Sequence, residues 1–151
     1  MVEIAISAAR VVRLFGFEPK VAFVSHSTFG QPLTIRTKHI RRAVEILKEK
    51  KVDFEFDGDM QPDVALDSEY EALYPFSKIV GKANILIMPG QHSAAISYKM
   101  MKTFGYTKVI GPLLIGLGLP IEIAPLRSST SELINLASIA AYSADVIDYK
   151  K

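Results

Sequence analysis

Two short, continuously apolar runs constrain the fold of this chain more than any other feature. KVAFVSH covers residues 20–26 and ANILIMPG covers residues 83–90. Runs of this length without polar alternation are typical of strands that are covered on both faces of a parallel sheet. Segments with helical periodicity separate them. The sequence therefore predicts an α/β fold with a mostly parallel sheet.

Four longer segments have the periodicity of helices. Residues 2–15 are apolar around almost the whole circumference, which predicts a helix buried on more than one side. Residues 34–50 predict an amphipathic helix with Thr34 as its N-cap. SAAISYKMMKTFG predicts a helix ending at Gly105, and residues 130–146 predict a last, largely apolar helix. The apolar stripe of the amphipathic helix consists of Ile40, Val44 and Leu47.

The segment VDFEFDGDM, residues 52–60, alternates between apolar and acidic side chains. This pattern predicts a strand with one solvent-exposed face near a sheet edge, followed by a helix over residues 63–73. A cation site is the alternative, but it requires oxygens that converge on one point. The apolar side is Val52, Phe54 and Phe56, and the acidic side is Asp53, Glu55 and Asp57, with Asp59 beyond them.

Composition limits the class of protein. The 151 residues are 49% hydrophobic, and the mean hydropathy of +0.21 indicates one domain with surplus apolar surface. No apolar run is long enough to span a membrane, so we expect an oligomer interface or a partner domain to cover that surface. A net charge of +2 without interleaved aromatic residues disfavours nucleic acid.

The absence of cysteine excludes disulfides, thiolate metal sites and a cysteine nucleophile. The N-terminal residues lack the basic region and the cleavage pattern of a signal peptide. Together these observations predict a cytoplasmic protein. A metal site is not expected, because His26, His39 and His92 lack metal-ligand spacing.

Small hydroxyl residues and a glycine, Ser25 to Gly30, follow the first apolar run. Ligands of parallel sheets bind at the carboxyl ends of strands, and N–H groups at a helix start favour anions. The alternative is an ordinary turn with capping groups. Ser128, Ser129 and Thr130 leave the same choice, because they could cap the last helix with Glu132 or form a second anion site. A basic surface, Arg36, Lys38, Arg41 and Arg42, is interpreted as solvated.

Five motifs in order make the chain resemble the phosphate acetyl/butyryltransferase family. They are EPKVAFVSHSTFG, DFEFDGDMQPDVAL, GKANILIMPG, VIGPLLIGLGLPI and ELINLASIAA. Within this family the chain is most similar to the phosphotransacetylase-like module at the C-terminus of bacterial NADP-dependent malic enzymes. The resemblance covers nearly the whole chain but only the second half of the module, so we expect an excised piece of a longer protein.

The resemblance implies a three-layer α/β/α fold similar to isocitrate and isopropylmalate dehydrogenases, dimeric through helices of the second lobe. Residues 2–120 would form that lobe. Residues 121–151 would supply a C-terminal strand and helix that return to the missing first lobe.

The resemblance also implies that catalysis has been lost. Active members carry Ser-x-Ser-Thr-Lys-Gly in the first loop, whereas this chain has Phe29 in place of the lysine. An ungapped alignment places Pro125 and Leu126 on the Ser-Arg pair that holds acyl phosphate and thioester, and Glu132 on the aspartate that deprotonates the thiol. A shift of one residue would bring Arg127 near the arginine position. Proline and leucine offer no donor to phosphate.

The function expected from the resemblance is a non-catalytic regulatory and oligomerisation domain that binds acetyl-CoA as an allosteric effector. NADP and a divalent metal would belong to the malic enzyme's catalytic domains, and the chain itself would hold no cofactor. The expected partners are the rest of that chain, at least one further copy, and acetyl-CoA, without nucleic acid or membrane. The alternatives are an active phosphate acyltransferase and a purely structural dimerisation module.

The candidate site has no expected catalytic or metal-binding residue. The residues expected to bind acetyl-CoA or another anion are Ser25, Ser27, Thr28, Gly30, Gln61, Asp63, Gln91, His92, Arg127, Ser128 and Ser129.

Overall fold

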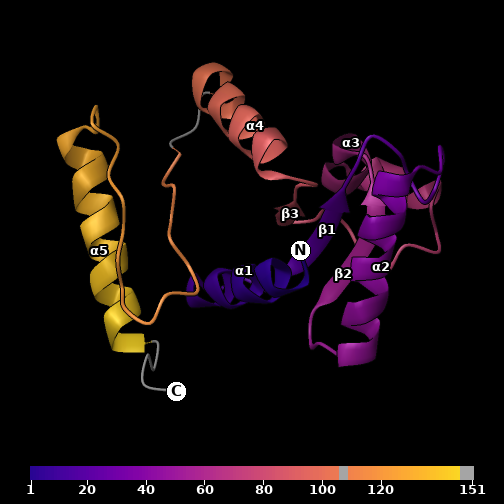
Figure 1. The fold of residues 1–151 in the computed structure, drawn as a ribbon, viewed down its shortest axis with the longest axis horizontal. Helices are drawn as coiled ribbons and strands as arrows, with labels where there is room; N and C mark the ends of the chain where they lie inside the picture. The colour runs from indigo at the N-terminus through magenta and orange to yellow at the C-terminus, as the bar shows by residue number, and fades with distance from the viewer. Residues whose placement is uncertain (106–108, 147–151) are drawn as a thin grey trace. The chain divides into compact units, whose positions relative to one another are not determined.

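A small parallel sheet organises the first part of the molecule (Figure 1). The computed structural model describes residues 1–105 and 109–146, which belong to two compact units, Met1–Ser97 and Tyr98–Lys151. The sheet lies in the first unit, has the strand order β2-β1-β3, and both of its strand pairs are parallel. The predicted α/β fold with a parallel sheet is confirmed. The strands are β1 (Lys20–Val24), β2 (Glu55–Met60) and β3 (Ile85–Ile87).

The four long helices form where their periodicity predicts them. They are α1 (Val2–Leu14), α2 (Ile35–Lys50), α4 (Gln91–Phe104) and α5 (Thr130–Val146). The single helix expected over residues 63–73 is wrong, because the segment forms α3 (Pro62–Leu66) and a 3-10 helix, η1 (Ser68–Ala72). The side chain of Asp67 accepts a hydrogen bond from the Glu69 N–H at 3.1 Å. This local bond starts a new turn and interrupts the first helix.

Apolar side chains cover the sheet on both faces. On one face, Val21 and Phe23 of β1 join a core with Ala9 of α1 and Leu47 of α2. On the opposite face, Ala22 packs in a second cluster with residues of α3 and of the segment before β3. Val21, Ala22 and Phe23 are fully buried. The first unit therefore has three layers, and β1 is covered on both faces as its apolar run predicts.

Helix α2 starts and packs as its sequence predicts. The Thr34 hydroxyl accepts a hydrogen bond from the Thr37 N–H, and the Thr37 hydroxyl accepts one from the Thr34 N–H. This reciprocal cap fixes the first turn. The predicted stripe is buried: Ile40, Val44 and Leu47 are at most 3% exposed. Helix α1 buries Ala5 and Ala9 within this unit, while Ile4 is 58% exposed, so burial of a second side stays a prediction.

The acidic face of β2 is buried at Asp57 and Asp59, which corrects the predicted solvent exposure for these two residues, whereas the Glu55 side chain is 40% exposed. Asp57 is 7% exposed and Asp59 is fully buried. The Asp57 carboxylate accepts hydrogen bonds from the Gly58 N–H at 2.9 Å and the Lys78 N–H at 2.8 Å. Sequence alternation does not reveal that residues 77–83 return over this face. The edge position of β2 in the described sheet is confirmed.

The second unit contains α5 and the residues that lead to it. The described residues 109–129 form neither helix nor strand, so the strand expected at the start of residues 121–151 is absent there. An apolar stretch becomes a strand only where a neighbouring strand supplies hydrogen bonds, and no described strand pairs with this one. The Tyr98 hydroxyl donates to the Gly111 carbonyl at 3.0 Å. The division into lobes at residue 120 stays a prediction.

Candidate functional site

The loop after β1 lies at the carboxyl edge of the sheet, beside the ends of β2 and β3. Because β1 is the central strand, its loop is flanked by both neighbours, the usual ligand position in such sheets. The Ser25 N–H donates to the Met60 carbonyl at 2.8 Å, which extends the pairing of β1 with β2. Ser25, Ser27 and Thr28 are all buried, and His26 is exposed. The sequence prediction that this loop ends the strand is confirmed.

A buried carboxylate holds the loop in place. The Ser27 hydroxyl donates to Asp59 Oδ2, and the Ser27 N–H donates to Ser25 Oγ at 3.3 Å. Ser27 and Asp59 are fully buried, and Asp59 Oδ1 has no hydrogen-bond partner among the described residues. In this conformation the Ser27 hydroxyl is therefore directed into the protein. Direct contact between Ser27 and a ligand stays a prediction.

Asp59 is the member of this cluster that sequence reasoning missed. Its place in an alternating acidic segment indicated exposure, whereas β2 turns its end toward the loop. The sequence feature that could have indicated the buried position of Asp59 is the neighbouring Gly58, whose φ of +150° is accessible only to glycine. A Cβ atom at Gly58 would lie 2.7 Å from both Cβ and the carbonyl oxygen of Phe23. The close approach of the two strands therefore requires glycine beside Asp59.

A tight turn presents the remaining loop residues. Thr28 and Gln31 exchange backbone hydrogen bonds of 3.2 and 3.1 Å, and the Gln61 N–H donates to Thr28 Oγ1 at 3.2 Å. The structure thus brings the predicted residues Ser25, Ser27, Thr28 and Gln61 together. Gly30 has a φ of +88°, and a Cβ atom there would lie 2.7 Å from a guanidinium nitrogen of Arg41.

Phe29 is the loop residue that the resemblance sets against the lysine of active family members. Its φ of 49° is uncommon for a residue with a side chain. The ring makes contacts with Phe76 at a centroid distance of 4.8 Å and with Tyr74 at 5.4 Å. This aromatic cluster packs the Phe29 ring against Tyr74 and Phe76 and thereby stabilises the turn.

The other predicted residues of the first unit are more exposed. Asp63 accepts a hydrogen bond from the Tyr70 hydroxyl at 3.4 Å, and the negative charge of Asp63 raises the pKa of Tyr70. Gln91 and His92 begin α4, which three residues separate from the end of β3, and are exposed. Since β3 neighbours β1, both residues follow a strand end at the same sheet edge as the loop.

Glu132 of the second unit is held in a cap of α5. Its Oε2 accepts hydrogen bonds from the Ser129 N–H at 2.7 Å and the Ser129 hydroxyl at 3.0 Å, while its own N–H donates to Ser129 Oγ at 3.3 Å. Lys102 Nζ donates to Glu132 Oε1 at 2.8 Å. The Lys102 hydrogen bond first, and the Ser129 bonds next, lower the pKa of Glu132 to about 2.

The capping interpretation of this serine cluster is therefore confirmed for Ser129. Ser128 Oγ is buried and has no partner among the described residues, and the exposed Arg127 precedes it. Arg127, Ser128 and Ser129 belong to the second unit, and their grouping with the first loop stays a prediction.

Residues 1–105 and 109–146 provide neither a metal site nor a membrane-spanning helix. No group of three or more histidine, aspartate and glutamate side chains there could hold a metal ion. None of the described helices combines the length and the hydropathy that crossing a membrane requires.

Comparison with known proteins shows the family to which the chain belongs. Residues 1–141 match the family described as phosphate acetyl/butaryl transferase, and the chain belongs to this family. The chain is 46% identical to the NADP-dependent malic enzyme of Rhizobium meliloti, with 95% of this chain and 19% of the relative covered. It is 36% identical to the phosphate acetyltransferase of Clostridium acetobutylicum, with 95% and 44% covered.

The solved structures agree with the sequence comparison. A phosphotransacetylase from Streptococcus pyogenes superimposes with a TM-score of 0.88 and 34% identity, over 95% of this chain and 44% of that one. The chain thus spans less than half of the phosphotransacetylases and about a fifth of the malic enzyme, at 19%. It is a phosphotransacetylase-like domain.

Proposed function

We propose that this chain is a non-catalytic regulatory and oligomerisation domain of an NADP-dependent malic enzyme, and that it binds acetyl-CoA as an allosteric effector. The catalytic domains of that enzyme would convert malate to pyruvate, carbon dioxide and NADPH with NADP and a divalent metal, in the cytoplasm. Acetyl-CoA lies downstream of pyruvate, which makes feedback a reasonable use of such a domain.

The lowered pKa and the hydrogen-bond partners of Glu132 are the main support for a non-catalytic domain. A general base works best when its pKa is near the working pH, and a thiol titrates at about 8.5. A carboxylate whose pKa is lowered to about 2, by Lys102 first and Ser129 next, is a poor base for that proton. Its two oxygens are already occupied by Lys102 and Ser129. In the ungapped alignment, Pro125 and Leu126 replace the family's Ser-Arg pair, and both are exposed without a phosphate donor.

Two observations support the malic-enzyme assignment over an active acyltransferase. Identity is 46% to the malic enzyme and 36% to the phosphate acetyltransferase. Phe29 replaces the loop lysine, and the aromatic contacts with Tyr74 and Phe76 retain it there.

Exposed apolar side chains support the role in assembly. Burying them against another surface would be favourable by roughly 25 cal/mol per Å². On α4, Ile96, Met100, Met101 and Phe104 are between 53% and 72% exposed.

The test uses the full-length protein. Malate-dependent NADPH formation is measured while acetyl-CoA is titrated, and binding is followed in parallel by calorimetry. The proposal predicts saturable heat and a change in malate turnover with the same midpoint, because an effector acts only through unequal affinity for two states. Equal concentrations of acetate and pantetheine are the controls. Absence of both heat and any effect on turnover would leave a purely structural module and contradict the proposal.

A further inference from the structure

A pocket on the first unit adjoins the loop cluster at Phe29 and lies between α2 and the segment that follows η1. Its volume is about 330 Å³, at the lower end of the range for small-molecule sites. Arg41 and Lys48 line it from α2, two turns apart, and Lys78 lines it from the opposite segment. Phe29 of the loop and Phe76 complete one wall.

Cationic side chains outnumber carboxylates in the pocket lining, with three against two. Within residues 1–105 and 109–146, the side chains of Arg41, Lys48 and Lys78 form no ion pair. The two carboxylates of the lining have other partners. Glu45 accepts a hydrogen bond from Arg42 at 3.0 Å, and Asp57 accepts two from backbone N–H groups. Three cations face two carboxylates around one hollow, and Glu45 is also paired with Arg42, so the lining is net positive and attracts an anionic ligand such as a phosphate group.

The aromatic wall adds a second requirement. Phe76 is 63% exposed although it contacts Phe29 edge-on. A large apolar ring left open beside cations is a surface on which a planar ring can stack. Inorganic phosphate or a sugar phosphate would use the cations and leave this ring uncovered. A phosphorylated nucleoside satisfies both features.

We infer that the pocket between α2 and residues 76–78 binds the phosphorylated nucleoside part of a nucleotide or coenzyme. Arg41, Lys48 and Lys78 hold the phosphates, and Phe76 stacks on the base. Gly30 contributes by leaving room for the Arg41 guanidinium, which a Cβ atom would approach to 2.7 Å. The inference does not require the thioester binding proposed above, since the same chemistry is present in free nucleotides and in coenzyme A.

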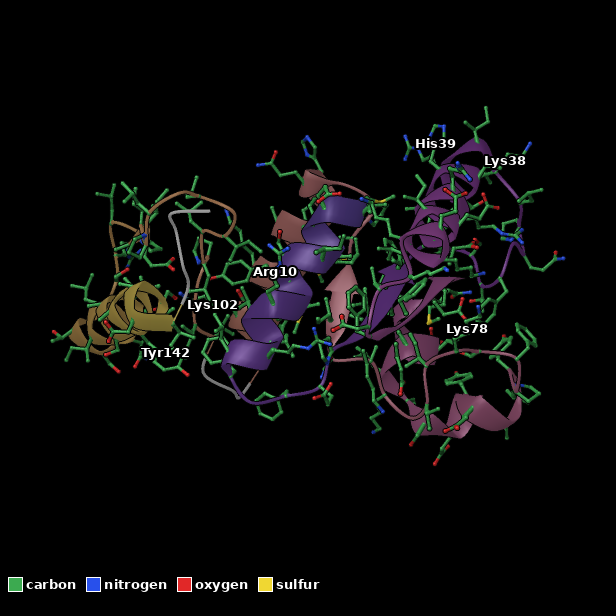
Figure 2. All side chains as sticks on the ribbon, turned by 90° about the horizontal axis from the view of Figure 1, so that it is seen from below. Arg10, Lys38, His39, Lys78, Lys102 and Tyr142 are labelled. Atoms are coloured by element: carbon green, nitrogen blue, oxygen red, sulfur yellow. The ribbon has the colours of Figure 1, made fainter. Side chains whose placement is uncertain are left out.

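Adenosine 3′,5′-bisphosphate is the probe, and the full-length protein is the sample. Calorimetry is expected to show saturable binding that weakens with salt, because exposed charges are screened. The double variant Arg41→Gln, Lys48→Gln should lose at least about tenfold in affinity. Lys38→Gln is the control on the same helix, because it removes one positive charge outside the pocket lining, and Figure 2 shows Lys38 beside His39, away from Lys78. It should bind like the wild type.

Aromatic variants test the stacking surface. Phe76→Ala should weaken binding about fivefold or more. Phe17→Ala removes another ring of 63% exposure and should change nothing. Unchanged thermal unfolding of each variant shows that the fold is retained. No saturable binding of the bisphosphate, or equal losses in Lys38→Gln and the double variant, would overturn the inference.

Competition separates this inference from the proposed function. Displacement of the bisphosphate by acetyl-CoA would assign the pocket to the coenzyme's nucleotide end, and independent binding of the two would assign it to a free nucleotide. Both outcomes support the inference. If the bisphosphate binds here and acetyl-CoA does not bind at all, the inference stands and the proposed function fails. If acetyl-CoA binds and the bisphosphate does not, the inference fails alone.

Discussion

Substitution of Gly58 by alanine tests the close approach of β1 and β2 beside the candidate site. A Cβ atom at Gly58 would lie 2.7 Å from Cβ and 2.7 Å from the carbonyl oxygen of Phe23, whose side chain is fully buried and has no free space. Backbone strain at a φ of +150° costs about 1–3 kcal/mol, and overpacking costs about as much again. We therefore expect Gly58→Ala to lower the free energy of unfolding by about 2–6 kcal/mol, a large share of the usual total.

Gly81→Ala is the matched control. Gly81 also has a positive φ, +75°, but a Cβ atom there would meet nothing within 4 Å. Only the conformational cost applies, about 1–2 kcal/mol. Urea unfolding followed by circular dichroism measures both variants, since the chain contains no tryptophan. Equal destabilisation of the two variants would refute the argument that Phe23 requires glycine at this position.

Three further perturbations follow from the described contacts. Leu47→Ala should lower the free energy of unfolding in urea by about 2–5 kcal/mol, because Leu47 is fully buried. Leu33→Ala, at a side chain that is 55% exposed, should lower it by less than about 0.5 kcal/mol. Similar losses in the two variants would contradict the described core. Thr34→Ala should cost about 1 kcal/mol in the same assay by removing the α2 cap, and no loss would argue against that cap. The pKa of Glu132 is lowered from 4.5 to about 2, so its ionised carboxylate stabilises the fold fully above pH 4.5 and loses this contribution as the pH falls toward 2. The stability measured by urea unfolding between pH 6 and 2.5 should therefore depend less on pH in Glu132→Gln than in the wild type. Identical pH profiles of the two proteins would contradict the described cap.

Much of the fold follows from local patterns. Helix α2 is defined by the stripe of Ile40, Val44 and Leu47 and by its Thr34 cap, all of which act within a few residues. The run around Phe23 predicts a doubly covered strand, because no polar side chain needs water. These features depend on short-range physics, and the sequence contains that information directly.

The errors arise where distant segments decide the environment. Asp57 and Asp59 are buried because residues far along the chain donate to Asp57 and the β1 loop donates to Asp59. Alternation within β2 carries no sign of those partners. The serine cluster before α5 was the opposite case, because the Ser129–Glu132 spacing already contained the capping answer.

The central claim is that this phosphotransacetylase-like domain holds its ligand without reacting with it. The most direct measurement is phosphate-dependent release of coenzyme A from acetyl-CoA by the full-length protein, with an active phosphate acetyltransferase as the positive control. The account predicts no release above the rate without protein. Turnover at about 1 per second or faster, within the ordinary range of enzymes, would contradict it.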